Sequence, residues 1–369
     1  MEIETNTYSL ESFLIHLINN SEKIFEKPPR WLKVYLIYVT ADWRDLFNRL
    51  EQHEMGDILK IVFIENLEKI SFYIYEYSPG LLLLFTSSKE KDYENTLNRF
   101  IQKNIGLSNV WIRPLILNKL LNHLRNKYDS NIYRFISRRH KNWKTPSQIR
   151  PNIDRRLSYS GEDADKTLDE VHHLYGVIPS TIDVKILNNK LQLNRRGLFV
   201  FRRVSRQTVE ILMELIDIIG REELRIKEIS EKLKIFKEKI VVKNKELKIP
   251  VIVAGKITLP RTKLSTFMIE NMFDPDYFQR SFDNTDDNIE SAFSFIDKNI
   301  TDAPYLLFNA TVIDKVKGTI FGLSGTENNI LLIPKHYSTF ESFKKFYDLI
   351  SEMFDDEAEL STLSNYLVT

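Results

Sequence analysis

A basic and aromatic strip, YRFISRRHKNWKTPSQIRPNIDRRLSY, runs from Tyr133 to Tyr159. It holds eight Lys or Arg residues, four aromatic residues and one acid, Asp154. Arg binds phosphate oxygens through a planar pair of hydrogen-bond donors, and Lys supplies a point charge. Aromatic faces add stacking with unpaired bases, worth roughly 1–3 kcal/mol per base. Cations and rings at this density indicate a surface that grips the phosphate backbone of DNA or RNA.

Further arginines follow the strip and extend the predicted surface. Arg195 and Arg196 precede Gly197 at a predicted hairpin tip, and two more follow the next predicted strand. The predicted nucleic-acid-binding residues are Arg134, Arg138, Arg139, Lys141, Trp143, Lys144, Arg150, Arg155, Arg156, Arg195, Arg196, Arg202 and Arg203.

The charge of the chain is unevenly distributed. Residues 131–206 hold 16 Lys or Arg against 7 Asp or Glu, a net charge of +9, whereas the whole chain carries +1, which leaves −8 for the rest. Much of the negative charge falls in residues 273–290 and 354–359. Such asymmetry bears on the choice of partner and on electrostatic steering, not on the fold.

Other interpretations of the strip remain open. Its arginines would merely face water if the apolar residues among them formed the buried side of a strand. They would also be neutralised by the acids that follow, Glu162, Asp163 and Asp165. The segment could instead be an exposed linker, or dock onto an acidic protein surface.

A metal-dependent nuclease is the alternative enzymatic hypothesis. Asp183 and Lys185 form an acid-x-Lys pair on a predicted strand, with Asp169 or Glu170 as the upstream acid. Nucleases of the PD-(D/E)xK type use this pattern to hold a divalent metal and activate water. The pattern is degenerate, because strand alternation alone produces acid-x-Lys triplets.

Three other motifs favour structural explanations. His172 and His173 point in different directions on a helix and lack a nearby third ligand, which indicates surface or cap histidines. Gly318, Gly322 and Gly325 lack the Lys-Ser/Thr ending of a phosphate loop, so a hairpin turn at Ser324-Gly325 explains them better. A helix-turn-helix over 208–244 is weakened by the β-branched centre of FKEKIVVKNKEL; a helical hairpin between two α/β blocks is the simpler interpretation.

Composition limits the remaining classes. The chain has no Cys, which excludes disulfides, thiolate metal sites and Cys nucleophiles. Its apolar runs are far shorter than the roughly 20 residues of a membrane helix, and the acidic, polar start MEIETNTYS is unlike a signal peptide. We therefore expect a cytoplasmic protein that does not bind membranes.

The hydrophobic patterns predict a multi-domain α+β fold. Antiparallel sheets are expected from hairpins that each lead into an amphipathic helix, as in ISFYIYEYSPGLLLLF, KLQLNRRGLFVF and GTIFGLSGTENNILLIP, with a helical middle region. The predicted segments are an N-terminal α/β domain (1–128), a basic α/β domain (129–220), a helical connector with a strand and an acidic segment (221–300), and a C-terminal hairpin plus helix (301–369).

Together these patterns predict a noncatalytic nucleic-acid-binding or adaptor subunit. It would work within a larger nucleic-acid-processing assembly or an antiviral host-defence complex, with a protein partner or a second copy. We expect no catalytic residue, metal or cofactor. The alternatives are the nuclease and a purely protein-binding scaffold.

Overall fold

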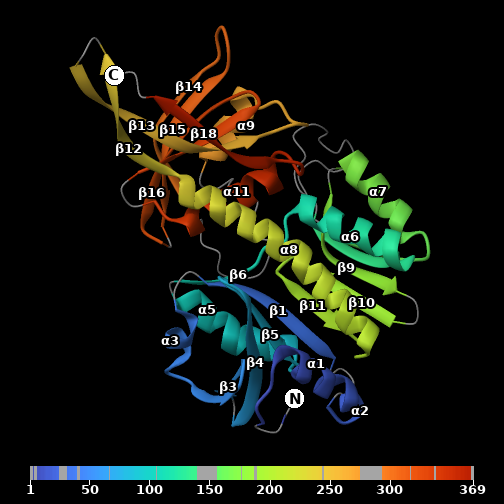
Figure 1. The fold of residues 1–369 in the computed structure, drawn as a ribbon. Helices are drawn as coiled ribbons and strands as arrows, with labels where there is room; N and C mark the ends of the chain where they lie inside the picture. Colours follow the sequence, from blue (N-terminus) through green and yellow to red (C-terminus); the bar gives the residue numbers. More distant parts are fainter. Residues whose placement is uncertain are drawn as a thin grey trace. The chain divides into compact units, whose positions relative to one another are not determined.

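The computed structural model divides the chain into two compact units (Figure 1). Residues 3–366 are described, except 4–5, 25–30, 40–41, 66, 105, 139–155, 176, 187–188, 243–244, 275–292, 316 and 336–337. Unit 1 comprises Met1–Ile112, Ile116–Arg138 and Arg155–Gly220; unit 2 comprises Arg113–Leu115, Arg139–Asp154 and Arg221–Thr369. Each unit contains an antiparallel sheet with helices, which confirms the predicted α+β class.

Unit 1 is built on one large sheet. Its strands follow the order β2-β3-β4-β5-β1-β11-β10-β9-β7-β8, and β6 also pairs with β1. Their bounds are β1 Leu32–Val39, β2 Glu51–Met55, β3 Ile58–Glu65, β4 Glu68–Ser78, β5 Leu81–Thr86, β6 Leu107–Asn109, β7 Asn131–Arg138, β8 Arg156–Ser160, β9 Ile178–Ile186, β10 Asn189–Asn194 and β11 Leu198–Phe201. Because β1 pairs with both β5 and β11, the predicted segments 1–128 and 129–220 contribute to the same sheet.

Helices cover much of this sheet. They are α1 Leu10–Asn19, α2 Ser21–Ile24, α3 Trp43–Phe47, α4 Glu90–Tyr93, the π-helix η1 Glu94–Asn98, α5 Arg99–Lys103, α6 Pro114–Tyr128, α7 Ala164–Tyr175 and the first part of α8, Arg206–Lys232. One core joins Tyr35, Ile37 and Val39 of β1 to Tyr93 and Leu97 of the α4–η1 segment. All eight residues of β1 are buried, as expected for a strand covered on both faces.

Unit 2 contains a second antiparallel sheet in the order β12-β13-β17-β16-β15-β14, and β18 also pairs with β13. The strands are β12 Lys234–Val242, β13 Lys245–Thr258, β14 Phe293–Thr301, β15 Leu307–Asp314, β16 Thr319–Thr326, β17 Asn329–Pro334 and β18 Glu359–Tyr366; the helices are α9 Thr266–Phe273 and α11 Phe340–Met353. Phe343, Phe346 and Ile350 of α11 pack into the core with Phe321 and Leu332 of the sheet. The predicted segments 221–300 and 301–369 therefore share this sheet.

Hairpins lead into helices as predicted. The β4–β5 pair precedes α4, β10–β11 precedes α8, and β16–β17 precedes α11. Two details differ from expectation. Gly325 lies inside β16 opposite Phe308 and Ile330, so the turn falls at Glu327 and Asn328. The helix-turn-helix alternative and the helical hairpin expected over 208–244 are both wrong, because the single helix α8 is followed by strand β12, which contains β-branched residues such as Ile240 and Val241.

A buried group of charges lies inside unit 2. Arg113 donates to Asp348 at 3.0 Å and to Glu222 at 3.3 Å, and it lies 3.9 Å from Glu223. Lys344 binds Asp348 at 2.8 Å and approaches Glu223 at 3.5 Å. Burial alone would lower the pKa of Arg113, but the surrounding carboxylates outweigh burial and raise it. The group pairs its buried charges, as burial in low dielectric requires.

Within the described residues, no helix is both long and apolar enough to cross a membrane.

Candidate nucleic-acid interface

One face of β9 and β10 carries polar side chains, here called the polar face. In register, Asp183 of β9 stands opposite Gln192 of β10, which stands opposite Val200 of β11. Side chains alternate between the two faces of a strand. The polar face therefore contains Thr181, Asp183, Lys185, Lys190, Gln192 and Asn194.

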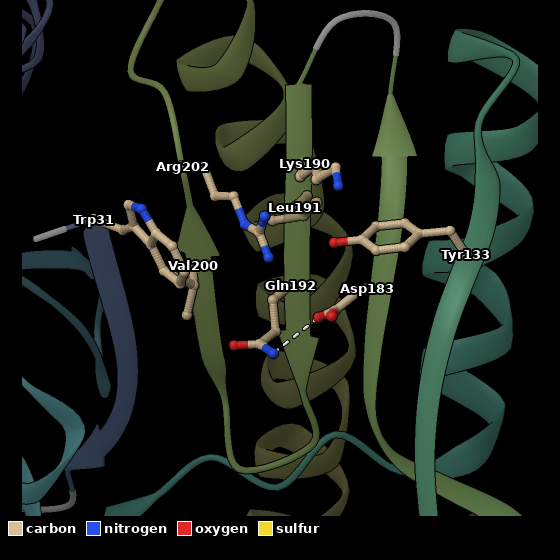
Figure 2. Close-up of a pocket in the computed structure, with 8 residues that line it drawn as sticks. All are labelled: Trp31, Tyr133, Asp183, Lys190, Leu191, Gln192, Val200 and Arg202. Atoms are coloured by element: carbon tan, nitrogen blue, oxygen red, sulfur yellow. Dashed lines mark hydrogen bonds between the residues drawn. The ribbon is translucent and has the colours of Figure 1, made fainter. Parts of the chain in front are cut away.

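The alternate positions of the same strands are apolar and buried. They include Ile182, Val184, Leu191, Leu193 and Phe199. Helix α8 lies against this other side of the strands, behind them in Figure 2, whereas the polar side chains project to the front. At β9 and β10, one face of the sheet is thus buried in unit 1, and the opposite face carries polar side chains. Over β11 and β1 that opposite face is buried as well, with Leu198, Val200 and Tyr35 in a hydrophobic core.

A shallow pocket lies on the polar face (Figure 2). Its empty volume, which includes open solvent, is about 210 Å³. It is lined by Trp31, Tyr133, Asp183, Lys190, Leu191, Gln192, Val200 and Arg202. The pocket therefore combines two aromatic rings with two cations, one acid and one amide.

Each aromatic ring of the pocket is paired with a cation. The guanidinium carbon of Arg202 lies 4.7 Å from the ring centre of Trp31, and the ammonium of Lys190 lies 4.6 Å from that of Tyr133. Arg202 and Lys190 are exposed, and both rings are partly exposed. A cation–π pair contributes roughly 0.5–1 kcal/mol at exposed sites. This interaction holds each cation near its ring but is weak enough for a ligand to displace the cation.

Asp183 organises the centre of the pocket. Asp183 is buried, with only 3% of the residue exposed. Its carboxylate accepts a hydrogen bond from Nε2 of Gln192 at 2.8 Å. Nη1 of Arg134 approaches its other oxygen at 3.5 Å. Because a carboxylate accepts hydrogen bonds, it fixes the Gln192 amide with nitrogen inward and Oε1 outward. Figure 2 shows Oε1 pointing away from Asp183.

Burial and the charged side chains of the pocket together set the pKa of the Tyr133 hydroxyl. Burial raises the pKa of the Tyr133 hydroxyl, and the Asp183 carboxylate raises it further. Arg202 and Arg134 oppose the rise. The Tyr133 hydroxyl therefore stays protonated near neutral pH and is able to donate a hydrogen bond.

Several of the predicted arginines lie at or near this pocket. Arg202 lines it, Arg134 binds its acid, and Arg203 is exposed next to Arg202. Arg138 and Arg156 are opposite one another on β7 and β8, and only their backbone is described. The other strip positions, Arg139, Lys141, Trp143, Lys144, Arg150 and Arg155, lie outside the described residues.

The two arginines predicted at the β10–β11 turn, Arg195 and Arg196, both bind other groups of the protein. Arg195 is 3% exposed, donates from Nε to the carbonyl of Ile112 at 2.9 Å, and lies over the ring of Trp111. Arg196 forms an ion pair with Glu94 at 3.6 Å. Arg195 does not face solvent as the hairpin-tip prediction assumed, because its guanidinium supports the chain around residue 112.

Sequence reasoning missed Trp31, Lys190 and Gln192. The signal for Lys190 and Gln192 is the alternation in KLQLN, where polar residues occupy every second position. Trp31 gave no local signal. Strand β1 pairs with β11 so that Leu32 lies opposite Phe201, and this pairing brings Trp31 beside Arg202.

The nuclease residues do not form a metal-ligand group among the positions that the structure describes. Asp183 and Lys185 share the polar face, but no cluster of three His, Asp or Glu side chains suited to a metal ion occurs there. Nδ1 of His172 lies 3.2 Å from the carbonyl oxygen of Val177, in line with a structural histidine.

Fold and site together define a two-unit α+β protein with an open polar sheet face. Residues 116–196, from α6 into the turn after β10, match a family model described as a family middle domain. The chain is also similar to a protein of Archaeoglobus fulgidus that bears the name "Uncharacterized protein". The two are 24% identical over 332 residues, which cover 87% of this chain and 82% of that protein. The middle-domain match includes Tyr133, Asp183 and Gln192.

Proposed function

We propose that this chain binds nucleic acid through the polar face of unit 1. The observation that carries the proposal is the pocket itself, where the Trp31–Arg202 and Tyr133–Lys190 pairs flank Gln192. Cations serve phosphates and rings serve bases. The net charge of +9 over residues 131–206 would attract a polyanion to this part of the chain.

The size of the pocket favours a polymer over a small molecule. Even its total empty space of about 210 Å³, which includes open solvent, falls short of the roughly 300–1,000 Å³ of typical small-ligand pockets. A shallow site of this kind suits repeated surface contacts along a chain of nucleotides better than enclosure of one metabolite. We further propose, as the composition and charge pattern of the sequence suggested, a noncatalytic role as an adaptor subunit in the cytoplasm, with a protein partner or a second copy, in a nucleic-acid-processing or host-defence complex.

Salt dependence of oligonucleotide binding tests this proposal. Fluorescence anisotropy with labelled DNA and RNA should show log affinity falling with log salt, by about 0.7 per phosphate contact on single strands and about 0.9 on duplexes. A Lys190→Gln, Arg202→Gln variant should lose two such contacts, so its slope on single strands should fall by about 1.4.

The matched control is Lys119→Gln. Lys119 is an exposed cation on α6, outside the pocket, and its loss should leave the slope unchanged. If the full chain binds neither DNA nor RNA at low salt, the proposal fails and the protein-binding scaffold becomes the better account. Equal slopes for the double variant and its parent would remove the polar face as the binding surface.

A further inference from the structure

The pocket contains polar groups whose hydrogen-bonding capacity is unused. Within the described residues, the Gln192 Oε1, the Tyr133 hydroxyl and the Trp31 Nε1–H make no hydrogen bond to the protein, although all three residues line the pocket. They offer one acceptor, one donor that also accepts, and one donor. Converging polar groups beside apolar surface are typical of a ligand site.

The orientation of the acceptor is set before any ligand arrives. Asp183 holds the Gln192 amide by a 2.8 Å hydrogen bond, and Arg134 in turn approaches Asp183. Rotation of the amide would place Oε1 against the carboxylate, which is repulsive. Gln192 is therefore preorganised to receive an N–H group from a ligand, which lowers the ordering cost of binding.

These groups match the edge and face of a nucleobase better than they match a phosphate. Every base has a face that stacks on an aromatic ring or a guanidinium plane, and an edge with N–H donors and acceptors. In a duplex the base faces are stacked on one another and the Watson–Crick edges are paired, so the two rings would have no base to stack on and Gln192 could reach only the groove edges. A surface for phosphates alone needs only cations.

We infer that the pocket receives an unpaired base, so the substrate class is single-stranded nucleic acid. The inference rests on the proposed function and specifies it. The base stacks on Trp31 or Tyr133 and donates from its edge to the Gln192 Oε1. Lys190 and Arg202 contact the adjoining phosphates.

Wild-type protein and three matched probes test this inference. The probes are a single-stranded 12-mer, the same 12-mer annealed to its complement, and a single strand of equal length whose central bases are replaced by abasic sites. The abasic strand keeps its phosphates and loses its bases. Since stacking contributes roughly 1–3 kcal/mol per base, we expect it to bind about 5- to 150-fold more weakly than the intact strand for each base that occupies the pocket.

Variants then assign the effect to the pocket. Trp31→Ala should weaken binding of the intact strand by a similar factor while leaving the salt slope and the duplex affinity unchanged. Trp31→Phe should restore most of the affinity, because it keeps a ring. Gln192→Leu should weaken the intact strand and leave the abasic strand unaffected.

The outcomes separate this inference from the proposed function. Equal affinity for intact, annealed and abasic probes, with a salt slope that the Lys190→Gln, Arg202→Gln variant lowers, would overturn the unpaired-base inference and leave nucleic-acid binding standing. Binding of none of the probes at low salt would overturn both. Binding of an acidic peptide in place of every oligonucleotide would also overturn both.

Discussion

Replacement of Arg113 by alanine should destabilise unit 2 severely. Arg113 is 2% exposed and faces the carboxylates of Asp348, Glu222 and Glu223 at 3.0, 3.3 and 3.9 Å. Its guanidinium also lies 4.9 Å from the ring centre of Tyr347. Without it, Lys344 would be the remaining buried cation that the structure describes in this group.

The size of the effect follows from this imbalance. Removal of one partner from a buried ion pair typically costs about 3–5 kcal/mol, because the other charge stays buried without compensation. That is a large share of the roughly 5–15 kcal/mol that stabilises an ordinary domain. By contrast, Arg206→Ala removes one member of an exposed i,i+4 pair with Glu210, and such pairs contribute only about 0.3–0.5 kcal/mol.

Hydrogen exchange on the full chain measures the effect in each unit separately. Amides of α11 and of Arg221–Lys232 in α8 should exchange faster in Arg113→Ala, while those of β3 and β4 in unit 1 should exchange as in the parent protein. A loss below about 1 kcal/mol would refute the reasoning that the carboxylates depend on Arg113. So would faster exchange confined to unit 1.

Three further predictions test other parts of the structure. Burial raises the pKa of Glu214, but hydrogen bonds with Lys127, His123 and Tyr128 outweigh it and lower that pKa to about 2. The stabilisation from Glu214 should be complete above about pH 4.5 and vanish as pH falls toward 2; in denaturant titrations of unit 1, Glu214→Gln should remove this part of the pH dependence. In Gly325→Ala, the new Cβ would lie 2.3 Å from the Phe308 ring and 2.6 Å from the Asn329 carbonyl oxygen; thermal melts should show a loss of about 1–3 kcal/mol, whereas Gly220→Ala, inside α8 with its nearest contact at 3.5 Å, should stabilise by up to about 1 kcal/mol. The parent protein should not cleave DNA or RNA when magnesium is added. Magnesium-dependent cleavage that the Asp183→Ala substitution abolishes would establish the nuclease alternative instead.

Much of the fold could be predicted from the sequence because hairpins and the helices after them are specified by residues that are close together in the chain. The KLQLNRRGLFVF hairpin and the helix after it are adjacent in sequence, and turn residues with hydrophobic periodicity specify both. The same applies to the β16–β17 hairpin and α11. The β-branched centre of FKEKIVVKNKEL weakened the helix-turn-helix hypothesis, but we still expected a helical hairpin there, and the structure has strand β12 instead.

Long-range pairing explains what local patterns could not supply. Trp31 reaches Arg202 only because β1 pairs with β11, which also merges two predicted segments into one sheet. Arg113 and Asp348 are likewise separated by 235 positions. In sequence, Arg195 resembled the exposed Arg202 and Arg203, but counting arginines does not reveal that the Arg195 guanidinium is buried.

Photo-crosslinking tests the central claim most directly. A single-stranded oligonucleotide with photoreactive bases would be irradiated with the full chain, and crosslinked peptides would be mapped by mass spectrometry. Our account predicts crosslinks at Trp31 and Tyr133, on peptides that are far apart in sequence and meet at one pocket. Crosslinks confined to unit 2, or none at these two residues despite binding, would contradict it.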